Sequence, residues 1–148
     1  MRRHLIVAVA ALLTACGGSA DDDLWRSDGL KVQAEAYVNA MPSVIFPDQA
    51  QSCSNFIISY SVVGQTSAIP KPASVKSVSA SKKGQVLWTG PVSVAESGQG
   101  QDGSLYGVAR GCPPTGLAEN DLLDIVLHIE AASQSGDATA QAVLYFAY

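Results

Sequence analysis

Charge is scarce in this 148-residue chain, and basic charge is scarcer than acidic. Only 15% of the residues are charged, and nine Lys and Arg face thirteen Asp and Glu, which gives a formal net charge of −4. Beyond Arg2-Arg3, basic residues cluster only at Lys82-Lys83, where a turn accounts for them. Because proteins hold nucleic acid phosphates with clustered Lys and Arg, we expect no nucleic acid partner.

Residues that carry chemistry are also few, with two histidines and three cysteines in the whole chain. No Gly-x-Ser-x-Gly motif of a nucleophile elbow is present. The glycine-rich segment 98–103 lacks the lysine and the following helix of a phosphate loop. The sequence therefore predicts no catalytic residue, no metal site and no cofactor, and we expect a protein that is not an enzyme. A hydrolase built from a serine, His128 and a carboxylate is the least favoured alternative.

Asp124, His128 and Glu130 share one parity in the apolar segment 122–131, so they would lie on the same face of a strand. Imidazole and carboxylate groups can bind a metal ion. The solvent face of a half-buried strand accounts for the same pattern, and stable metal sites usually draw ligands from several elements. We therefore interpret these residues as a solvated face.

The chain has no apolar run long enough to span a bilayer, which takes about 20 residues. Its longest such run, Leu5–Leu13, follows the basic start Met1-Arg2-Arg3-His4, as in a secretory signal. The run ends at Leu13-Thr14-Ala15-Cys16, which resembles the lipobox of bacterial lipoproteins. In that family the cysteine sulfur receives a diacylglycerol, a peptidase cuts before the cysteine, and the new amine is often acylated, frequently with palmitate.

The resemblance implies that residues 1–15 are a signal peptide and that Cys16 is the lipidated residue. It also implies a membrane partner through the lipid anchor and a place in the cell envelope. Gly17 departs from the Asp that retains lipoproteins in the inner membrane, which implies the outer membrane if the host has two. Residues 16–29 then form an acidic tether that contains Trp25, which we expect either to pack on the domain or to meet the membrane interface.

No window shows a convincing helical period, and alternation of apolar and polar residues dominates instead. Residues 30–148 therefore predict one all-β domain, an antiparallel β-sandwich of seven or eight strands that is immunoglobulin- or fibronectin-like in style. A transthyretin-like sandwich or a small barrel is the alternative. The expected strands cover 31–39, 56–63, 75–80, 85–88, 92–96, 105–110, 122–131 and 138–147. Trp88 shares its parity with Val86 and is expected in the core, and the last strand is expected to be paired.

Cys53 and Cys112 remain when Cys16 carries lipid. An even pair in an exported protein usually forms a disulfide bond. Cys53 precedes one expected strand and Cys112 follows another, so both would lie at the same end of the domain if these strands are antiparallel. The sequence predicts that a Cys53–Cys112 bond clamps the loops at that end. Their separation does not match the C-x-x-C spacing of a redox pair.

The loop 39–51 is apolar for a surface segment, and a second loop follows Cys112. Loops held at one end of a rigid sandwich often carry binding residues. Our candidate binding residues are Met41, Val44, Ile45, Phe46, Pro113 and Pro114. We therefore expect a protein-interaction domain, for example an accessory subunit of an envelope or secretion assembly. The alternative is a module that binds carbohydrate or another ligand through exposed aromatic residues.

Overall fold

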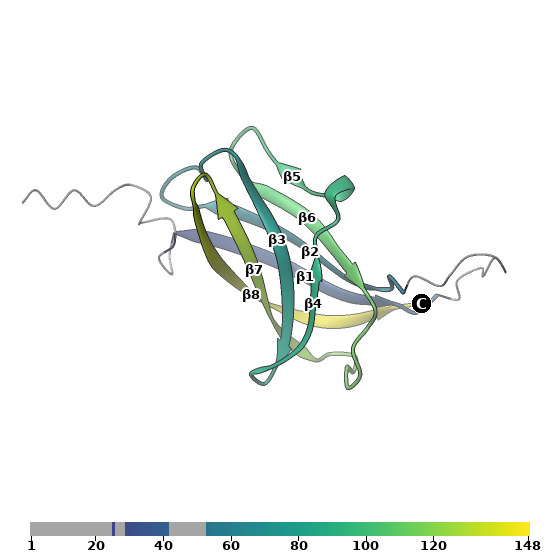
Figure 1. Cartoon of the computed structure of the whole chain (residues 1–148). Coiled ribbons are helices and arrows are strands. Elements are labelled where there is room, and N and C mark those ends of the chain that lie inside the picture. Colours follow the sequence, from purple (N-terminus) through teal and green to yellow (C-terminus); the bar gives the residue numbers. More distant parts are fainter. Residues whose placement is uncertain (1–24, 26–28, 42–52) are drawn as a thin grey trace, which may run out of the picture.

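The computed structural model describes Trp25, residues 29–41 and residues 53–148. Over this part the chain is all-β: a single mixed sheet of eight strands curls on itself, and one turn of 3-10 helix interrupts it (Figure 1). The elements are β1 (Leu30–Asn39), β2 (Phe56–Gly64), β3 (Ala73–Lys82), β4 (Gln85–Pro91), η1 (Val94–Glu96), β5 (Gly98–Gln99), β6 (Leu105–Gly111), β7 (Leu122–Ala131) and β8 (Gln134–Ala147). The all-β class and the number of strands that the sequence predicts are confirmed.

The strand order in the sheet is β4-β3-β7-β8-β1-β2-β6-β5. The long strand β8 joins the two halves, because its first ten residues pair with β7 and Leu144–Ala147 pair with β1. The inclined strands β1, β2 and β6 lie behind β3, β4 and β7 in the view of Figure 1. This arrangement combines the two layers of a sandwich with the curl of a small barrel.

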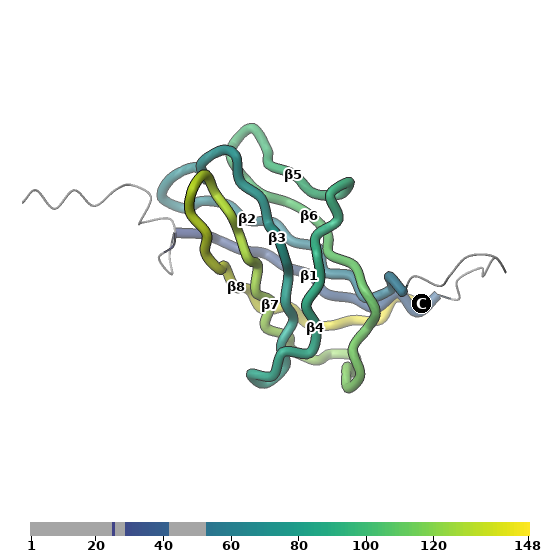
Figure 2. Tube along the Cα trace, in the orientation of Figure 1, coloured from purple at the N-terminus to yellow at the C-terminus, as the bar shows by residue number. Residues whose placement is uncertain are grey.

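The two ends of the sheet approach each other just after the end of β4. Val92 forms an isolated bridge to Ala109 of β6, and the Ser93 N–H donates to the Val108 carbonyl over 2.8 Å. The trace in Figure 2 shows this segment passing beside β6. These bonds join the β4 end of the sheet to its β6 end along a short stretch.

Three details differ from the sequence-based expectation. The pairing is not wholly antiparallel, because β1 and β8 are parallel. The expected strand 92–96 is wrong: only Val92 bridges, and Val94–Glu96 form η1 with Val94 exposed to 93%. Val86 is exposed while Trp88 packs on the core, because a register shift in the β3–β4 pairing inserts Leu87 and breaks the alternation.

The core lies inside the curl and consists of the inward-facing alternate residues of the long strands. Its largest fully buried side chains are Phe56, Ile58, Val62, Val78, Leu105, Leu123, Ile125, Leu127, Ile129 and Leu144. The ring of Trp88 meets Phe56 edge to face with centroids 5.3 Å apart. Burial of such side chains contributes about 1.5–3 kcal/mol each, so this core is the main source of stability.

Tight turns connect the hairpins as their residues require. Lys83 and Gly84 both have positive φ angles, 51° and 79°, which suits the two-residue turn between β3 and β4. The turn predicted at Lys82-Lys83 is thus confirmed, and it connects the hairpin of β3 and β4. The pairing predicted for the last strand is confirmed as well, since the Ala40 N–H donates to the Ala147 carbonyl over 2.8 Å.

Candidate functional site

A row of apolar side chains crosses the outer face of β7, β8 and β1. Leu122 is the register partner of Val143, and Tyr145, two residues further along β8, is the partner of Tyr37 on β1. Leu122 is exposed to 52%, Val143 to 55% and Tyr145 to 43%. We call these four residues, Leu122, Val143, Tyr145 and Tyr37, the tyrosine strip. Alternation along each strand points them away from the core and toward solvent.

The two tyrosines of the strip form a rigid pair. Their rings stack with centroids 5.3 Å apart and an interplanar angle of 16°. Partial burial raises the pKa of Tyr145, and the nearby Glu35 carboxylate and Tyr37 raise it further, so the phenol stays neutral at physiological pH. The pair therefore presents an uncharged aromatic surface whose conformation is fixed by stacking.

On β2, the next strand of the sheet, the apolar row continues with a buried residue. Ile57, the partner of Tyr37, is only 5% exposed although it belongs to the outward parity. Arg110 is the next partner across the sheet, and its guanidinium forms two hydrogen bonds with Glu96, at 2.9 and 2.6 Å. This ion pair holds the Glu96 pKa below its usual range. The strip therefore ends at a polar boundary on this side.

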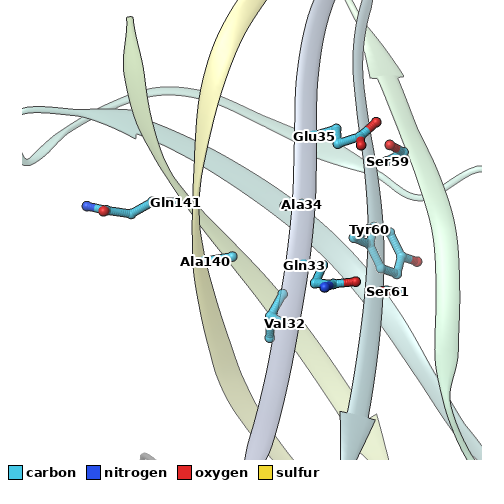
Figure 3. A pocket seen from close by; sticks show the side chains of 9 residues that line it. All are labelled: Val32, Gln33, Ala34, Glu35, Ser59, Tyr60, Ser61, Ala140 and Gln141. Atoms are coloured by element: carbon cyan, nitrogen blue, oxygen red, sulfur yellow. The ribbon is translucent and has the colours of Figure 1, made fainter.

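A hollow of about 660 Å³ lies between β8, β1 and β2. Figure 3 shows its lining, which is Val32, Gln33, Ala34, Glu35, Ser59, Tyr60, Ser61, Ala140 and Gln141. Among the described residues that line it, Glu35 is the one that carries charge. At its β8 wall the Gln141 amide donates to Asp124 over 2.9 Å. The hollow thus combines small apolar side chains with hydrogen-bonding groups and an acidic carboxylate.

A smaller apolar cavity of about 150 Å³ lies where β3 faces β5 and β6. Tyr60 and Ser97 contribute hydroxyl groups to it, and Val94 and Tyr106 are exposed members of its lining. Burial raises the Tyr60 pKa, an effect that its hydrogen bond with Ser97 opposes. The cavity is the size of one aliphatic side chain, and none of the described residues in its lining is charged.

The two cysteines expected to bond lie next to each other. Cys53 precedes β2 and Cys112 follows β6, and these strands are antiparallel with Phe56 opposite Gly111. Both thiols are free and exposed, and the Cys112 sulfur lies 3.7 Å from the Cys53 carbonyl oxygen. A hydrogen bond with the Cys112 thiol raises the pKa of Cys53. The structure brings the pair to one end of the domain, and the bond itself stays a prediction.

The predicted binding loops are only partly covered by the description. Met41 is exposed to 56%, with its N–H donating to the Asn39 side chain, and Pro113 and Pro114 are half-buried beside the cysteines. Val44, Ile45 and Phe46 lie outside the described residues, as do Cys16 and the lipobox. A binding role for these loops therefore stays a prediction.

The polar residues of β7 lie on the outer face of the sheet, as the sequence predicts. His128 Nδ1 lies 2.9 Å from Asp137 Oδ1 on β8, and Glu130 forms an ion pair with Lys76 whose Oε2–Nζ distance is 3.1 Å. No hydrogen bond joins His128 to a serine within the described residues. In the same part of the chain, no group of three or more His, Cys, Asp or Glu residues could hold a metal ion. No helix among the described residues is long and apolar enough to cross a membrane.

Trp25 packs on the domain, one of the two positions expected for it. Its indole N–H donates to the Gln134 side-chain oxygen over 2.9 Å, and its ring covers Gly136 at the start of β8. Trp25 is therefore held against the β7–β8 hairpin.

Comparisons with known proteins add no family to this description: the chain matches no family model and no curated protein sequence.

Sequence reasoning missed the tyrosine strip. The apolar end Tyr145-Phe146-Ala147-Tyr148 predicts a paired final strand, and it does not by itself indicate an exposed apolar surface. The better signal is that a strand with one face in the core should be polar on the other. Val143 and Tyr145 break that rule, and so does Leu122 opposite Val143.

Proposed function

We propose that this chain is a membrane-anchored lipoprotein of the cell envelope whose β domain binds a protein partner through the tyrosine strip. The strip is the observation that carries the proposal. Its members come from three strands and leave large apolar side chains in solvent, which soluble domains usually avoid unless the surface is covered by a partner.

The chemistry of the strip suits a protein interface. Tyrosine is enriched at the energetic centres of interfaces because it buries a large area at a small cost in side-chain entropy. Stacking of Tyr37 on Tyr145 orders both rings before any partner arrives. Hydrogen-bonding side chains flank the strip at Gln141 and Glu35, as expected of a polar rim.

The anchor rests on the resemblance of Leu13–Cys16 to a lipobox. Two or three acyl chains on Cys16 would hold the domain at a membrane surface, since one chain alone gives only marginal binding. Confinement near the membrane raises the local concentration of a partner in the same envelope, so a modest interface would be sufficient. An accessory subunit of an envelope or secretion assembly fits these conditions.

The test is site-specific photo-crosslinking in cells. A photoreactive amino acid at position 143 lies in the strip, and one at position 86 lies on an equally exposed apolar position of β4, because Val86 is exposed to 61%. We expect position 143 to capture one dominant protein and position 86 to capture none. The Cys16→Ala variant, exported but without lipid, should lose most of the product.

Intact-protein mass spectrometry of the same samples reports whether Cys16 carries acyl chains. An unmodified Cys16 would contradict the anchor. Equal labelling at positions 143 and 86 would contradict the use of the strip as an interface, even if the chain is anchored.

Carbohydrate binding is the second candidate function. It is favoured by Tyr145, whose half-exposed ring lies near the Glu35 carboxylate, a group suited to sugar hydroxyls. Each ring of the stacked pair, however, uses one face on the other, which leaves less aromatic surface for a sugar. Titration of the purified chain with envelope glycans, monitored by tyrosine fluorescence, would distinguish this function from protein binding.

A further inference from the structure

The curled sheet opens between β1 and β8. These strands pair only through Ala36–Asn39 and Leu144–Ala147. Before these residues, β1 pairs with β2 and β8 pairs with β7, and no backbone pairing joins β1 to β8. We call this opening the β1–β8 gap. Figure 3 shows residues of both strands around the hollow beside it.

The hydrogen-bonding direction of β1 follows from its ends. The Asn39 N–H donates to the Asn55 carbonyl over 2.7 Å, and the Gly29 carbonyl accepts from Gln65 over 2.9 Å. Antiparallel ladders alternate, so the odd-numbered residues of β1 direct their backbone groups toward β2. The N–H and C=O of Val32 and Ala34 consequently point into the gap.

The same reasoning applies to β8. The Leu144 N–H donates to the Asp121 carbonyl over 2.8 Å, so even-numbered residues of β8 bond toward β7. The backbone groups of Thr139 and Gln141 therefore point into the gap from the other side. Two strands thus present rows of backbone donors and acceptors to the same space.

The core is incompletely covered beside the gap. On β1 the inward residues Ala36 and Val38 are 0% and 8% exposed, whereas Leu30, Val32 and Ala34 are only partly buried. On β8, Ala140 is partly buried between two buried alanines. The loss of burial coincides with the loss of strand pairing, which is what an absent neighbouring strand produces.

We propose that the β1–β8 gap accepts an extended, basic segment of a partner protein, which adds to the free edge of β1 as a further strand. This mode of recognition takes its affinity from main-chain hydrogen bonds and its selectivity from alternate side chains. Small side chains of the segment would cover Val32 and Ala34 on the inner side. The inference rests on the proposed function, because it names how the partner of this domain is held.

The acidic residues near the hollow indicate that the bound segment is basic. Glu35 is the one charged residue among the described residues that line the hollow, and Asp124 adjoins the hollow through its hydrogen bond with Gln141. The chain as a whole carries a formal charge of −4. Lys or Arg on the outward side of an inserted strand would complement these carboxylates, whereas an acidic segment would be repelled.

The experiment uses the purified full chain in detergent and peptides selected on it from a random phage-displayed library. Ala34→Pro removes the N–H that points into the gap and leaves the β1–β2 ladder its donors. Ala34→Ser keeps that N–H and is the matched control. Peptides N-methylated at alternate residues test the same bonds from the ligand side, so the result does not depend on the folding of the proline variant.

We expect the selected peptides to be extended and basic. They should slow amide exchange at Val32 and Ala34, whereas the amide of Gln33, already bonded to β2, should not change. Ala34→Pro and N-methylation should each weaken binding at least tenfold, and Ala34→Ser should not. Equal affinity for Ala34→Pro, protection confined to other strands, failure to select any peptide, or occupation of the edge by a second copy of the chain would overturn the inference.

Crosslinking of the Ala34→Pro variant distinguishes loss of strand addition from loss of the interface. If photo-crosslinking at position 143 captures the same partner in Ala34→Pro as in the unaltered chain, the interface stands and strand addition is wrong. If no partner is captured in cells, the proposed function fails whatever the peptides do.

Discussion

The indole of Trp25 lies directly over Gly136, at the start of β8, and donates a hydrogen bond to Gln134. A methyl group at position 136 would overlap the six-membered ring of Trp25. Glycine at this position is therefore what allows Trp25 to pack on the β7–β8 hairpin.

Gly136→Ala should displace Trp25 and lower the free energy of unfolding by about 1–2 kcal/mol, as overpacking does in a filled site. The tryptophan emission should shift to longer wavelength as the indole becomes exposed, with Trp88 as a constant background. In a Trp25→Ala background the same change should cost nothing, because no ring remains to be displaced. An equal cost in both backgrounds would show that Gly136 serves the strand and not the contact with Trp25.

The sequence predicted where the strands lie along the chain better than it predicted which strands pair. Alternation located β1, β2, β6 and β7 to within a residue or two, because it reflects one buried face. It carried no information on which strands pair, so the parallel β1–β8 contact was missed. The position of Val86 was missed because the extra residue, Leu87, reverses parity within a short strand.

The candidate site was predicted less well than the fold. Cysteine spacing and the order of the strands were enough to place Cys53 and Cys112 at one end. The tyrosine strip depends on Tyr145 meeting Tyr37 across a pairing of the first and last strands, which no local pattern reveals. A surface built by distant pairing can be identified only when the topology is known.

Removal of the cysteine pair should lower stability only under oxidising conditions. If Cys53 and Cys112 bond in the exported protein, the bond closes a loop of about 60 residues, which the chain-entropy model values at about 4 kcal/mol. Denaturant unfolding of Cys53→Ser, Cys112→Ser and the double variant should give the same loss, because any one change breaks the bond. Full reactivity of both thiols in protein taken from the envelope would contradict the prediction.

The carboxylate of Asp121 should make stability depend on pH. It accepts hydrogen bonds from Lys82 and from the Ala118 N–H, both over 2.7 Å, and these bonds lower its pKa. Because its pKa is lower in the folded state than in the unfolded chain, the contribution is present above the ordinary Asp range and is lost as pH falls through the folded value. Asp121→Asn should therefore be less stable than the parent at pH 7, and the difference should shrink in acid.

Denaturant unfolding at pH 7 and pH 3 measures this difference. Glu119→Gln is the control, because that carboxylate is exposed and forms no ion pair within the described part of the chain. If the difference in free energy of unfolding between the parent and Asp121→Asn were the same at pH 7 and pH 3, the carboxylate would act through its shape alone.

Polar substitution in the tyrosine strip should separate binding from folding. Val143→Ser and Leu122→Ser remove two exposed apolar side chains that face each other across β7 and β8. Since both are more than half exposed, the double variant should lose about 1 kcal/mol of stability or less, within the range of surface changes. Capture of the partner by a photoreactive group at position 141, beside the strip, should fall at least tenfold, because interface energy concentrates in a few buried apolar contacts.

Val86→Ser is the control for this last prediction, since Val86 is as exposed as Val143 but lies on β4. It should leave capture unchanged. If Val86→Ser and the strip variant reduced capture equally, the effect would come from general surface hydrophobicity and the strip would have no special role. If the strip variant alone lost capture while its unfolding curve matched that of the parent, the loss could come only from the interface, because the fold that positions Tyr37 and Tyr145 would be intact.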